Sequence, residues 1–382
     1  MKLLVLGAGL QGGAAAFDLL RRSDIERVGV VDQDSERIER LRLRLGDRRL
    51  AMHAVDVADS DRVADVMQEY DACLSAVPYW FNVELTRAAI AAGIHFCDLG
   101  GNNAVVGEQL AQDAAAQDAG VTVVPDCGLA PGMANVLAAH AMRKLDDTAA
   151  LRIRVGGLPL HPRPPHDYQL VFAVEGLINE YVERCIVVRD GVKLSVEPLT
   201  EIESIEFPEP FGTLEAFHTS GGLSTLARTF AGKVRDMDYK TIRYPGHAIR
   251  MRALYDLGLF DTRPVALDDD VAVQPRALTA HLMRQRLTGD GPDVVLVRVT
   301  AIGTKHGGRR RIEYEIVDHR DPNHGITAMM RCTAYPASIV LQMLASGRIV
   351  TRGVVVQERA VPPEEFIAEL GQRGIRVVEK MS

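Results

Sequence analysis

Four glycines lie within seven positions near the start of the chain, in the sequence VLGAGLQGG of residues 5–13. Three of them, Gly7, Gly9 and Gly12, have the spacing G-x-G-x-x-G, which binds a pyrophosphate where a buried strand leads into a helix. The first glycine permits the tight turn, the second lets the backbone approach the phosphates, and the third lets the helix pack against the sheet. The phosphates then lie at the helix N-terminus, where free N–H groups bind anions. The motif therefore predicts a dinucleotide site.

An acidic residue follows the second apolar run at the distance that a ribose ligand requires. Asp32 lies 20 residues after Gly12, which is the spacing of the carboxylate that binds the ribose hydroxyls. This carboxylate repels a 2′-phosphate, so we predict NAD as the cofactor, although Arg37 nearby favours NADP. An alternative interpretation is a tight strand–helix turn without a ligand. The residues expected to contact the cofactor come from the turn and from the ends of the next strands: Gly7, Gly9, Leu10, Gln11, Gly12, Asp32, Asp56, Val57, Ser75, Ala76 and Val77.

Three further stretches place polar groups among glycines and prolines. FCDLGGN puts Asp98 at the end of a predicted strand, PDCGLAPGMAN follows the next strand, and TIRYPGH places Arg243 and His247 around a Pro-Gly turn. Asp98 is predicted to face the nicotinamide, because ligands of parallel sheets sit at the carboxyl ends of the strands. The alternatives are an aspartate that caps the turn after it and an arginine that is simply solvated.

The elements that must position these residues alternate between apolar strands and amphipathic helices over the first third of the chain. Continuous apolar strands separated by helices indicate a parallel sheet that is covered on both faces. The pattern predicts an α/β fold that begins with a doubly wound, NAD-binding Rossmann domain over residues 1–127. The predicted strands are 2–7, 27–32, 50–56, 71–77, 95–100 and 121–126, with helices at 35–45, 59–70 and 82–93.

The pattern then changes. A helix over 133–145 is followed by a proline-rich loop and two hairpins, which predicts a second, α+β domain with a mixed open sheet over residues 128–335. The first hairpin is expected to turn at Asp190-Gly191 and the second at Gly307-Gly308. The tail, residues 336–382, offers two more helices, the second with a proline at its start.

Composition restricts the class of protein. The chain has 382 residues and a net charge of −7, so it is too long for one small core and too acidic for a general nucleic-acid binder. Five scattered cysteines without a C-x-x-C pair indicate neither a disulfide framework nor a zinc site, and we predict no metal. No run of about 18 or more apolar residues occurs, so we expect no membrane span and a cytoplasmic location.

Several motifs resemble those of the saccharopine dehydrogenase-like family and, within it, the lysine 6-dehydrogenases. The motifs are GAGLQG, PDCGLAPGMANVLAAHAM, VGGLPLHPRPPHDYQLVFAVEGLINEYVERCIVVRDG, TSGGLSTL and RYPGH, which come in the family's order over most of the chain. The glycine motif is generic, whereas the long run is specific. The resemblance implies a substrate domain that also forms a homodimer or higher homo-oligomer, and a tail at 336–382 that returns to the Rossmann domain.

The resemblance also implies a reaction, the oxidation of an amino acid or polyamine at a carbon that bears nitrogen. The leading hypothesis is NAD-dependent oxidative deamination of L-lysine at the ε-carbon. A saccharopine or carboxynorspermidine dehydrogenase is the alternative, and a non-catalytic NAD-binding regulatory protein is a further one. Substrates of the first alternative carry a second carboxylate and need another basic clamp, for which the candidates are Arg163, Arg184 and Arg228.

Asp98, Tyr168 and Arg243 fall in motifs that line the family's cleft. An ε-ammonium with a pKa of about 10.4 must lose its proton before a hydride leaves, and Asp98 is the expected acceptor, with Tyr168 as the alternative. Arg243 is expected to bind the α-carboxylate, since a guanidinium binds a carboxylate through two parallel hydrogen bonds. The remaining residues assigned to the substrate site, the last two for the α-ammonium, are His247, Glu175 and Glu180.

Overall fold

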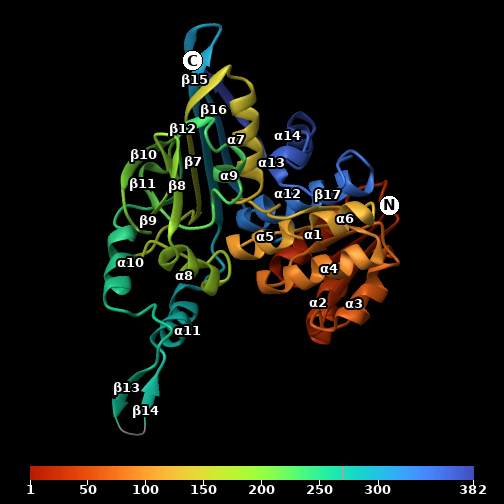
Figure 1. Ribbon diagram of the computed structural model, residues 1–382. Helices are drawn as coiled ribbons and strands as arrows, with labels where there is room; N and C mark the ends of the chain where they lie inside the picture. Colours follow the sequence, from red (N-terminus) through yellow and green to blue (C-terminus); the bar gives the residue numbers. More distant parts are fainter. Residues whose placement is uncertain (269–270) are drawn as a thin grey trace. The chain divides into compact units, whose positions relative to one another are not determined.

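The computed structural model describes residues 1–268 and 271–382, and the chain divides into two compact units (Figure 1). Unit 1 consists of Met1–His140, Ser224–Leu226 and Met330–Val377. Unit 2 consists of Ala141–Leu223, Ala227–Met329 and Val378–Ser382. Among the helices that these residues form, none has both the length and the apolar character that a membrane span requires.

Unit 1 contains a seven-stranded sheet in the order β17-β6-β5-β4-β1-β2-β3, with every pair parallel. The predicted doubly wound domain is therefore confirmed. The order reverses beside β1, which is where such sheets bind their ligands. The strands are β1 (Lys2–Leu6), β2 (Arg27–Asp32), β3 (Leu50–Ala54), β4 (Ala72–Ser75), β5 (His95–Asp98), β6 (Thr122–Val124) and β17 (Gly353–Val354).

Most helices of the N-terminal part follow the predicted amphipathic segments, whereas η1, α5 and α6 were not predicted. In α2, for example, Asp34 caps the N-terminus, Ile38 and Leu41 are buried one turn apart, and Gly46 ends the helix in the left-handed conformation. The helices are α1 (Leu10–Leu20), α2 (Ser35–Leu45), α3 (Ser60–Met67), η1 (Tyr79–Phe81), α4 (Asn82–Ala92), α5 (Asn103–Leu110), α6 (Asp113–Asp118) and α7 (Met133–Arg143).

Unit 2 contains a nine-stranded mixed sheet, which confirms the expected mixed sheet. Its main path is β10-β11-β12-β7-β15-β16-β18, with β8 paired to β12 and β9 paired to β8. The strands are β7 (Asp147–Pro159), β8 (Cys185–Arg189), β9 (Val192–Val196), β10 (Glu203–Phe207), β11 (Gly212–His218), β12 (Val234–Arg243), β15 (Asp293–Lys305), β16 (Gly308–His319) and β18 (Val378–Met381). The other elements are α8 (Val174–Val182), α9 (Leu226–Thr229), α10 (His247–Asp256), β13 (Val265–Asp268), β14 (Val271–Val273) and α11 (Pro275–Leu287).

The two predicted hairpins are present, and one turn is displaced. β8 and β9 turn at Asp190-Gly191, as expected. The turn between β15 and β16 lies at His306-Gly307, so its prediction at Gly307-Gly308 was wrong by one residue. Gly308 already pairs with Lys305, and the two turn residues have φ angles of 52° and 76°. Positive φ at both central residues is the geometry of a two-residue hairpin turn, which histidine adopts here in place of glycine.

The tail contains more structure than expected. The helix predicted from residue 336 begins earlier, as α12 (Ala328–Ala345), with Pro336 inside it. The second predicted helix is confirmed as α14 (Pro363–Gln372), which has Pro363 at its start. The sequence pattern missed the short α13 (Gln357–Ala360). It also missed β17 and β18, because a strand of a few residues has no visible periodicity.

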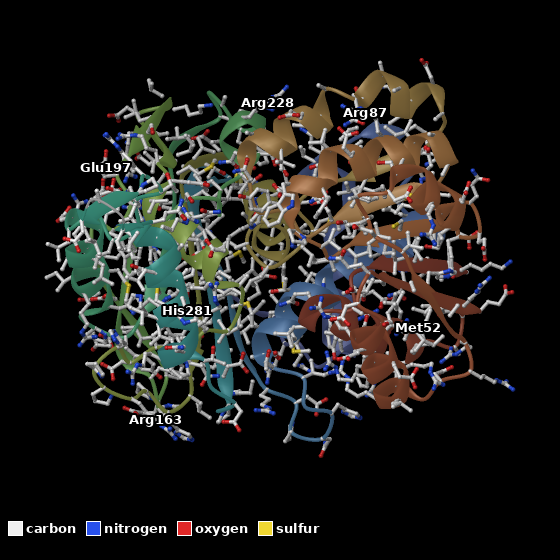
Figure 2. The ribbon with its side chains drawn as sticks, turned by 90° about the horizontal axis from the view of Figure 1, so that it is seen from below. Met52, Arg87, Arg163, Glu197, Arg228 and His281 are labelled. Atoms are coloured by element: carbon white, nitrogen blue, oxygen red, sulfur yellow. The ribbon has the colours of Figure 1, made fainter. Side chains whose placement is uncertain are left out.

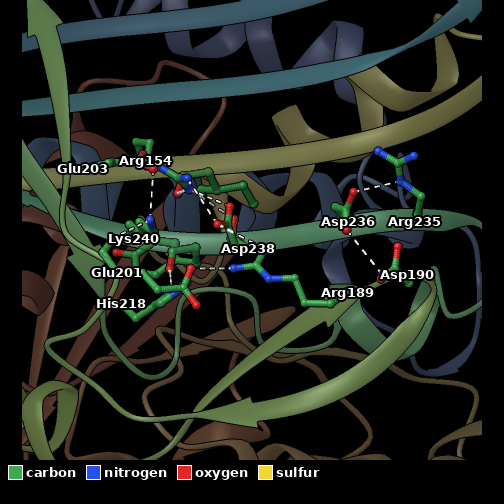
Figure 3. A network of polar contacts seen from close by, with 12 residues as sticks. Arg154, Arg189, Asp190, Glu201, Glu203, His218, Arg235, Asp236, Asp238 and Lys240 are labelled. Carbon is green, nitrogen blue, oxygen red and sulfur yellow. Dashed lines mark hydrogen bonds and ion pairs between the residues drawn. The ribbon is translucent and has the colours of Figure 1, made fainter.

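Charges on the unit 2 sheet are paired with one another (Figure 3). Arg154 on β7, whose side chain is 5% exposed, contacts Asp238 on the neighbouring strand β12 at 2.8 Å. It also contacts Glu203, which accepts a hydrogen bond of 2.9 Å from Lys240. Such pairing is what allows charged side chains to be buried at all.

A buried ion pair connects the tail to α1 within unit 1. Arg373 follows α14, and its Nε donates to the Asp18 carboxylate at 2.9 Å, with both side chains 4% exposed. Ser338 on α12 also donates to Asp18. Asp18 therefore holds two segments of the tail, and it depends on Arg373 for its counter-charge.

Replacing Arg373 with Met should destabilise the protein by about 3–5 kcal/mol, because the variant leaves the Asp18 charge buried without its partner. Adding Asp18→Asn to this variant should recover part of the loss, since the unpaired charge is then removed. Guanidinium unfolding followed by circular dichroism measures both effects. Arg376→Met, which changes an exposed arginine of the same tail, is the matched control. An equal loss in the control would show that Asp18 does not depend on this pair.

Candidate active site

The glycine turn between β1 and α1 is shaped by close backbone contacts. Gly7 has a φ of 101°, and a Cβ on it would lie 3.0 Å from the carbonyl oxygen of Ala76, which follows β4. A Cβ on Gly12 would lie 1.8 Å from the carbonyl oxygen of Gly7. Both positions therefore require glycine, the first for its conformation and the second for the packing of α1 on the turn.

The turn also has the features of a phosphate cradle. A Cβ on Gly9 would meet no atom within 4 Å, so the backbone is open at the point where a pyrophosphate would approach. In the first turn of α1, Leu10 is exposed, whereas the Gln11 side-chain oxygen is buried and has no hydrogen-bond partner among the described residues. These residues fit a dinucleotide phosphate at the helix N-terminus.

Asp32 lies at the end of β2, beside the glycine turn. Its Oδ2 accepts a hydrogen bond of 2.8 Å from the Ala8 N–H, and its Oδ1 accepts one of 2.9 Å from the Asp34 N–H. The Arg37 guanidinium is 3.4 Å from Oδ2. The carboxylate thus connects the glycine turn to the second strand, and it lies where the ribose hydroxyls are expected.

The other predicted cofactor contacts lie at or beyond strand ends. Ala76 and Val77 follow β4 and pack against the position of Gly7. The Ser75 hydroxyl is buried and donates to Asn82 at 2.7 Å, so it is used within the fold. β3 ends at Ala54, and the predicted residues Asp56 and Val57 therefore lie in the loop after it, where Asp56 accepts from the Ala58 N–H. Their contact with a cofactor stays a prediction.

Asp98 ends β5, as predicted, and its carboxylate is fully buried. Oδ1 accepts from the Gly100 N–H at 2.7 Å and from the Asp126 N–H at 3.1 Å, and Oδ2 accepts from the Gln109 amide at 2.7 Å. Burial raises the pKa of Asp98, although these three hydrogen bonds act in the opposite direction. Asp98 caps the turn and joins the ends of two strands; its role as proton acceptor stays a prediction.

Four of the predicted substrate residues meet within unit 2. Arg243 ends β12 and is 2% exposed, with its guanidinium 4.9 Å from the centre of the Tyr168 ring. The Tyr168 ring packs against His247, the first residue of α10, with ring centres 5.1 Å apart. Glu180 on α8 lies 3.9 Å from Arg243. Hydrophobic packing of α8 and α10 in one core holds these side chains together.

The electrostatics of this cluster favour a neutral histidine and a carboxyl group whose pKa lies near neutral pH. Partial burial raises the pKa of Glu180 to about 7, although Arg243 acts in the opposite direction. Burial, together with the Arg243 charge, lowers the pKa of His247. His247 Nε2 lies 2.9 Å from the hydroxyl of Tyr181, a residue that the sequence analysis missed. Glu175 is outside this cluster and pairs with Arg276 and Arg284.

Two polar residues at the Asp98 end of unit 1 were also missed. Asp126 follows β6 and is 1% exposed, and Ser224 donates a hydrogen bond to it. Both lie in stretches that the sequence analysis quoted, PDCGLAPG and TSGGLSTL, but nothing in the local pattern places them together. Apart from residues 269–270, the chain has no group of three or more side chains arranged to hold a metal.

A doubly wound sheet with this glycine turn and an acid at the end of its second strand defines a dinucleotide-binding protein. Residues 3–124 match the saccharopine dehydrogenase NADP binding domain, and residues 128–375 match the saccharopine dehydrogenase C-terminal domain. The chain belongs to the saccharopine dehydrogenase family. The matched N-terminal domain supports a nicotinamide dinucleotide as the cofactor.

Relatives of known name are distant in sequence. The chain is 22% identical to carboxyaminopropylagmatine dehydrogenase of Synechocystis sp., with 98% of this chain and 96% of that protein covered. It is 21% identical to mitochondrial alpha-aminoadipic semialdehyde synthase of Bos taurus, and it spans 45% of that protein's length for 93% of its own. Its fold matches apo saccharopine dehydrogenase (L-Glu forming) of Saccharomyces cerevisiae with a TM-score of 0.81 at 18% identity, over 100% of this chain and 99% of that one.

Replacing Asp32 with Ala should weaken the binding of NAD by about 1.5–3 kcal/mol and that of NADP by less, because a charge-assisted contact to the ribose is lost. Isothermal titration calorimetry of the purified protein with each cofactor measures the two affinities. Arg37→Ala is the companion variant and should weaken NADP more than NAD. If the ratio of the two affinities is unchanged in Asp32→Ala, the assignment of Asp32 to the ribose is wrong.

Proposed function

We propose that the chain catalyses the NAD-dependent oxidative deamination of L-lysine at its ε-carbon. The products are 2-aminoadipate 6-semialdehyde, or its cyclic form piperideine-6-carboxylate, together with ammonia and NADH. Membership of the saccharopine dehydrogenase family supports an oxidoreductase that acts on an amino acid. A homodimer and a cytoplasmic location belong to the same proposal.

The observation that carries the proposal is the state of Arg243. This guanidinium is almost fully buried, yet its nearest carboxylate oxygen is 3.9 Å away and its Nε has no hydrogen-bond partner within the described chain. One of its nitrogens donates to the carbonyl of Ile242, and the Tyr168 and Tyr181 hydroxyl groups also stabilise the guanidinium, but no carboxylate forms a hydrogen bond with it among the described residues. Burying a charge with so few partners is costly unless a ligand supplies them. An α-carboxylate is the group whose geometry matches the free edge of a guanidinium.

The surrounding groups suit the rest of an amino acid. Glu180 offers a carboxylate for the α-ammonium beside the Arg243 site, and the Tyr168 ring covers the guanidinium and excludes water from it. When bound, NAD supplies the hydride acceptor, held by the glycine turn and by Asp32. The protein must also remove one proton from the ε-ammonium, since only the neutral amine provides the lone pair that replaces the hydride.

NAD is proposed over NADP because the Asp32 carboxylate is fixed by two backbone N–H groups beside the turn. A carboxylate held there repels a 2′-phosphate. Arg37 lies on the same carboxylate, so its charge is partly neutralised by Asp32 and Asp34.

A second candidate function, saccharopine-type oxidation, is favoured by a cavity of about 570 Å³ that Tyr168 also lines. Basic side chains of the proline-rich loop and of the end of α11 surround it: His161, Arg163, His166 and Arg286. Figure 2 shows Arg163 at the periphery of the fold. A second carboxylate on the substrate would suit this cavity. The other clamp candidates are exposed, and Arg184 already pairs with Glu197.

A substrate panel tests the proposal directly. The purified chain with NAD or NADP should form the reduced cofactor, read by absorbance, with L-lysine and more slowly or not at all with saccharopine and carboxynorspermidine. Faster oxidation of saccharopine or carboxynorspermidine would transfer the proposal to the second candidate. No turnover with any amine, while NAD binds, would identify a non-catalytic dinucleotide-binding protein.

Arg243→Ala should raise the KM for the amino acid about ten- to 150-fold, since a hydrogen bond to a charged group contributes about 1.5–3 kcal/mol. Its affinity for NAD should stay unchanged, because the cofactor residues lie in the other unit. Steady-state kinetics and a cofactor titration measure the two effects. Arg243→Lys should recover little, because an ammonium cannot form two parallel hydrogen bonds. Arg252→Ala on α10, whose exposed side chain pairs with Asp256, is the control; an equal rise in KM there would contradict the clamp.

A further inference from the structure

Asp126 has a buried carboxyl group at the carboxyl ends of the unit 1 strands, and the site described above assigns it no role. This residue lies two positions after β6, next to the end of β5 in the sheet. It is therefore at the carboxyl edge, where the ligands of doubly wound sheets bind. Its side chain packs under the Gly100-Gly101 turn, where a Cβ on Gly100 would lie 2.0 Å from Asp126 Oδ1. That oxygen is buried, and no donor among the described residues lies at the distance and angle of a hydrogen bond to it.

Ser224 connects this buried carboxylate to a less buried position. Its hydroxyl donates to Asp126 Oδ2, and the serine itself is only half-buried. Both residues have a left-handed backbone, with φ angles of 63° at Asp126 and 43° at Ser224. Non-glycine residues adopt this conformation at a cost, and such strain gathers at functional sites. The contact thus joins two strained residues that are 98 positions apart in the sequence.

Two other carboxylates face Asp126 from neighbouring elements. Asp98 at the end of β5 accepts the Asp126 backbone N–H, and Glu358 on α13 is held by the Thr225 hydroxyl at 3.0 Å. Burial, with added repulsion from Asp98 and Glu358, raises the pKa of Asp126 to about 8, while the Ser224 hydroxyl and the Gly101 N–H act in the opposite direction. A carboxyl group in this range exchanges its proton close to neutral pH, as a general base must.

We propose that Ser224 and Asp126 form a proton relay that accepts the proton given up by the substrate amine. The inference rests on the proposed function, since it needs an amine that is oxidised. The Ser224 oxygen accepts one proton from the substrate ammonium while its own hydroxyl proton passes to Asp126 Oδ2. Ser224 stays neutral, the Asp126 carboxylate becomes a carboxylic acid, and the amine becomes neutral. The nitrogen lone pair is then free to form the C=N bond of the iminium as the neighbouring carbon loses a hydride, for which NAD, held by the glycine turn and Asp32, would be the acceptor.

Asp98 acts in this relay as a positioning residue. Its carboxylate oxygens are all engaged by the Gly100, Asp126 and Gln109 donors. It therefore fixes the backbone of Asp126, and its charge helps to keep the pKa of Asp126 high. Removing Asp98 disturbs the relay without removing the acceptor.

The pH dependence of amine oxidation by the full chain tests the relay. In the wild type, kcat/KM for the best amine of the panel should rise with pH through about 8, since the acceptor must be ionised. Asp126→Asn should remove this rise and lower kcat/KM at pH 7.5 by about 10²–10⁴-fold. The deficit should shrink near pH 10, where neutral amine is available from solution. Asp118→Asn, at the exposed end of α6, should behave as the wild type.

Two further variants, Ser224→Ala and Glu358→Gln, should move the pH midpoint of the rise in kcat/KM in opposite directions. A purely structural role of Asp126 would not produce such opposite shifts. Ser224→Ala removes a hydrogen bond that stabilises the carboxylate, so the midpoint should rise and the rate should fall. Glu358→Gln removes a repelling charge, so the midpoint should fall below that of the wild type. Asp98→Asn should lower the midpoint too, and it should keep a pH-dependent rise.

A thermal measurement reads the Asp126 proton without any substrate. The raised pKa of Asp126 means that the folded state keeps a proton which the unfolded chain releases near pH 4. Stability from this group is therefore present at low pH and is lost as the pH rises through about 8. The Tm of Asp126→Asn relative to the wild type should accordingly be higher at pH 9 than at pH 5, and Asp118→Asn should show no such change.

The outcomes separate the inference from the proposed function. If the wild type oxidises no amine, the proposed function fails and the relay fails with it. If the wild type is active and Asp126→Asn keeps both the rise near pH 8 and a rate within about tenfold of the wild type, the relay alone is wrong. A Tm difference that is constant between pH 5 and pH 9 would also overturn it, because Asp126 would then hold no proton at neutral pH.

Discussion

The cost of burying a charge without a partner organises both units of this protein. Asp18 and Arg373 meet this cost by pairing with each other, and Arg154 meets it by contacting two carboxylates. Arg243 meets it only in part, whereas Asp126 avoids it because burial raises its pKa to about 8 and so favours the neutral carboxyl group. The carboxylate nearest to Arg243 is that of Glu180, at 3.9 Å, and Oδ1 of Asp126 has no hydrogen-bond partner among the described residues. Buried polar groups that are short of partners are where a ligand gains the most from binding, and both groups lie in sequence stretches that carry the family resemblance.

In the proposed function, each unit carries a different kind of group. Unit 1 carries the glycine turn, Asp32 and a group of buried carboxyl residues, which suits a dinucleotide and a proton acceptor. Unit 2 carries the buried guanidinium beneath an aromatic ring, which suits the recognition of a carboxylate. The division follows from physics, since a proton acceptor needs an environment that raises the pKa of an acid, and a carboxylate clamp needs the opposite charge.

In the proposed function, the basic cavity beside Tyr168 is the feature that distinguishes a saccharopine-type substrate from lysine. One buried arginine is enough for an amino acid with a single carboxylate, whereas a secondary amine that joins two acids needs a second cation. The cavity supplies such cations from a proline-rich loop, in which local sequence sets little structure. Under this proposal, substrate class is set mainly by the proline-rich loop and not by the sheet that carries Arg243, so relatives can differ in substrate while they keep the fold.

The sequence by itself was sufficient for the parallel sheet, the cofactor turn and most helices, because each is encoded locally by apolar runs, glycine spacing and caps. The same holds for the acid at residue 32 and for the hairpin at Asp190-Gly191. Tertiary structure decided what depends on distant segments: that Glu180 rather than Glu175 lies beside Arg243, that β17 adds a strand from the tail, and that Ser224 bonds to Asp126. It also decided that an oxygen of Asp98 accepts hydrogen bonds from the N–H groups of Gly100, in the turn, and of Asp126, after the next strand. A pattern read along the chain contains no information on which donors surround a buried carboxylate, because those donors come from elements that only the folded chain brings together.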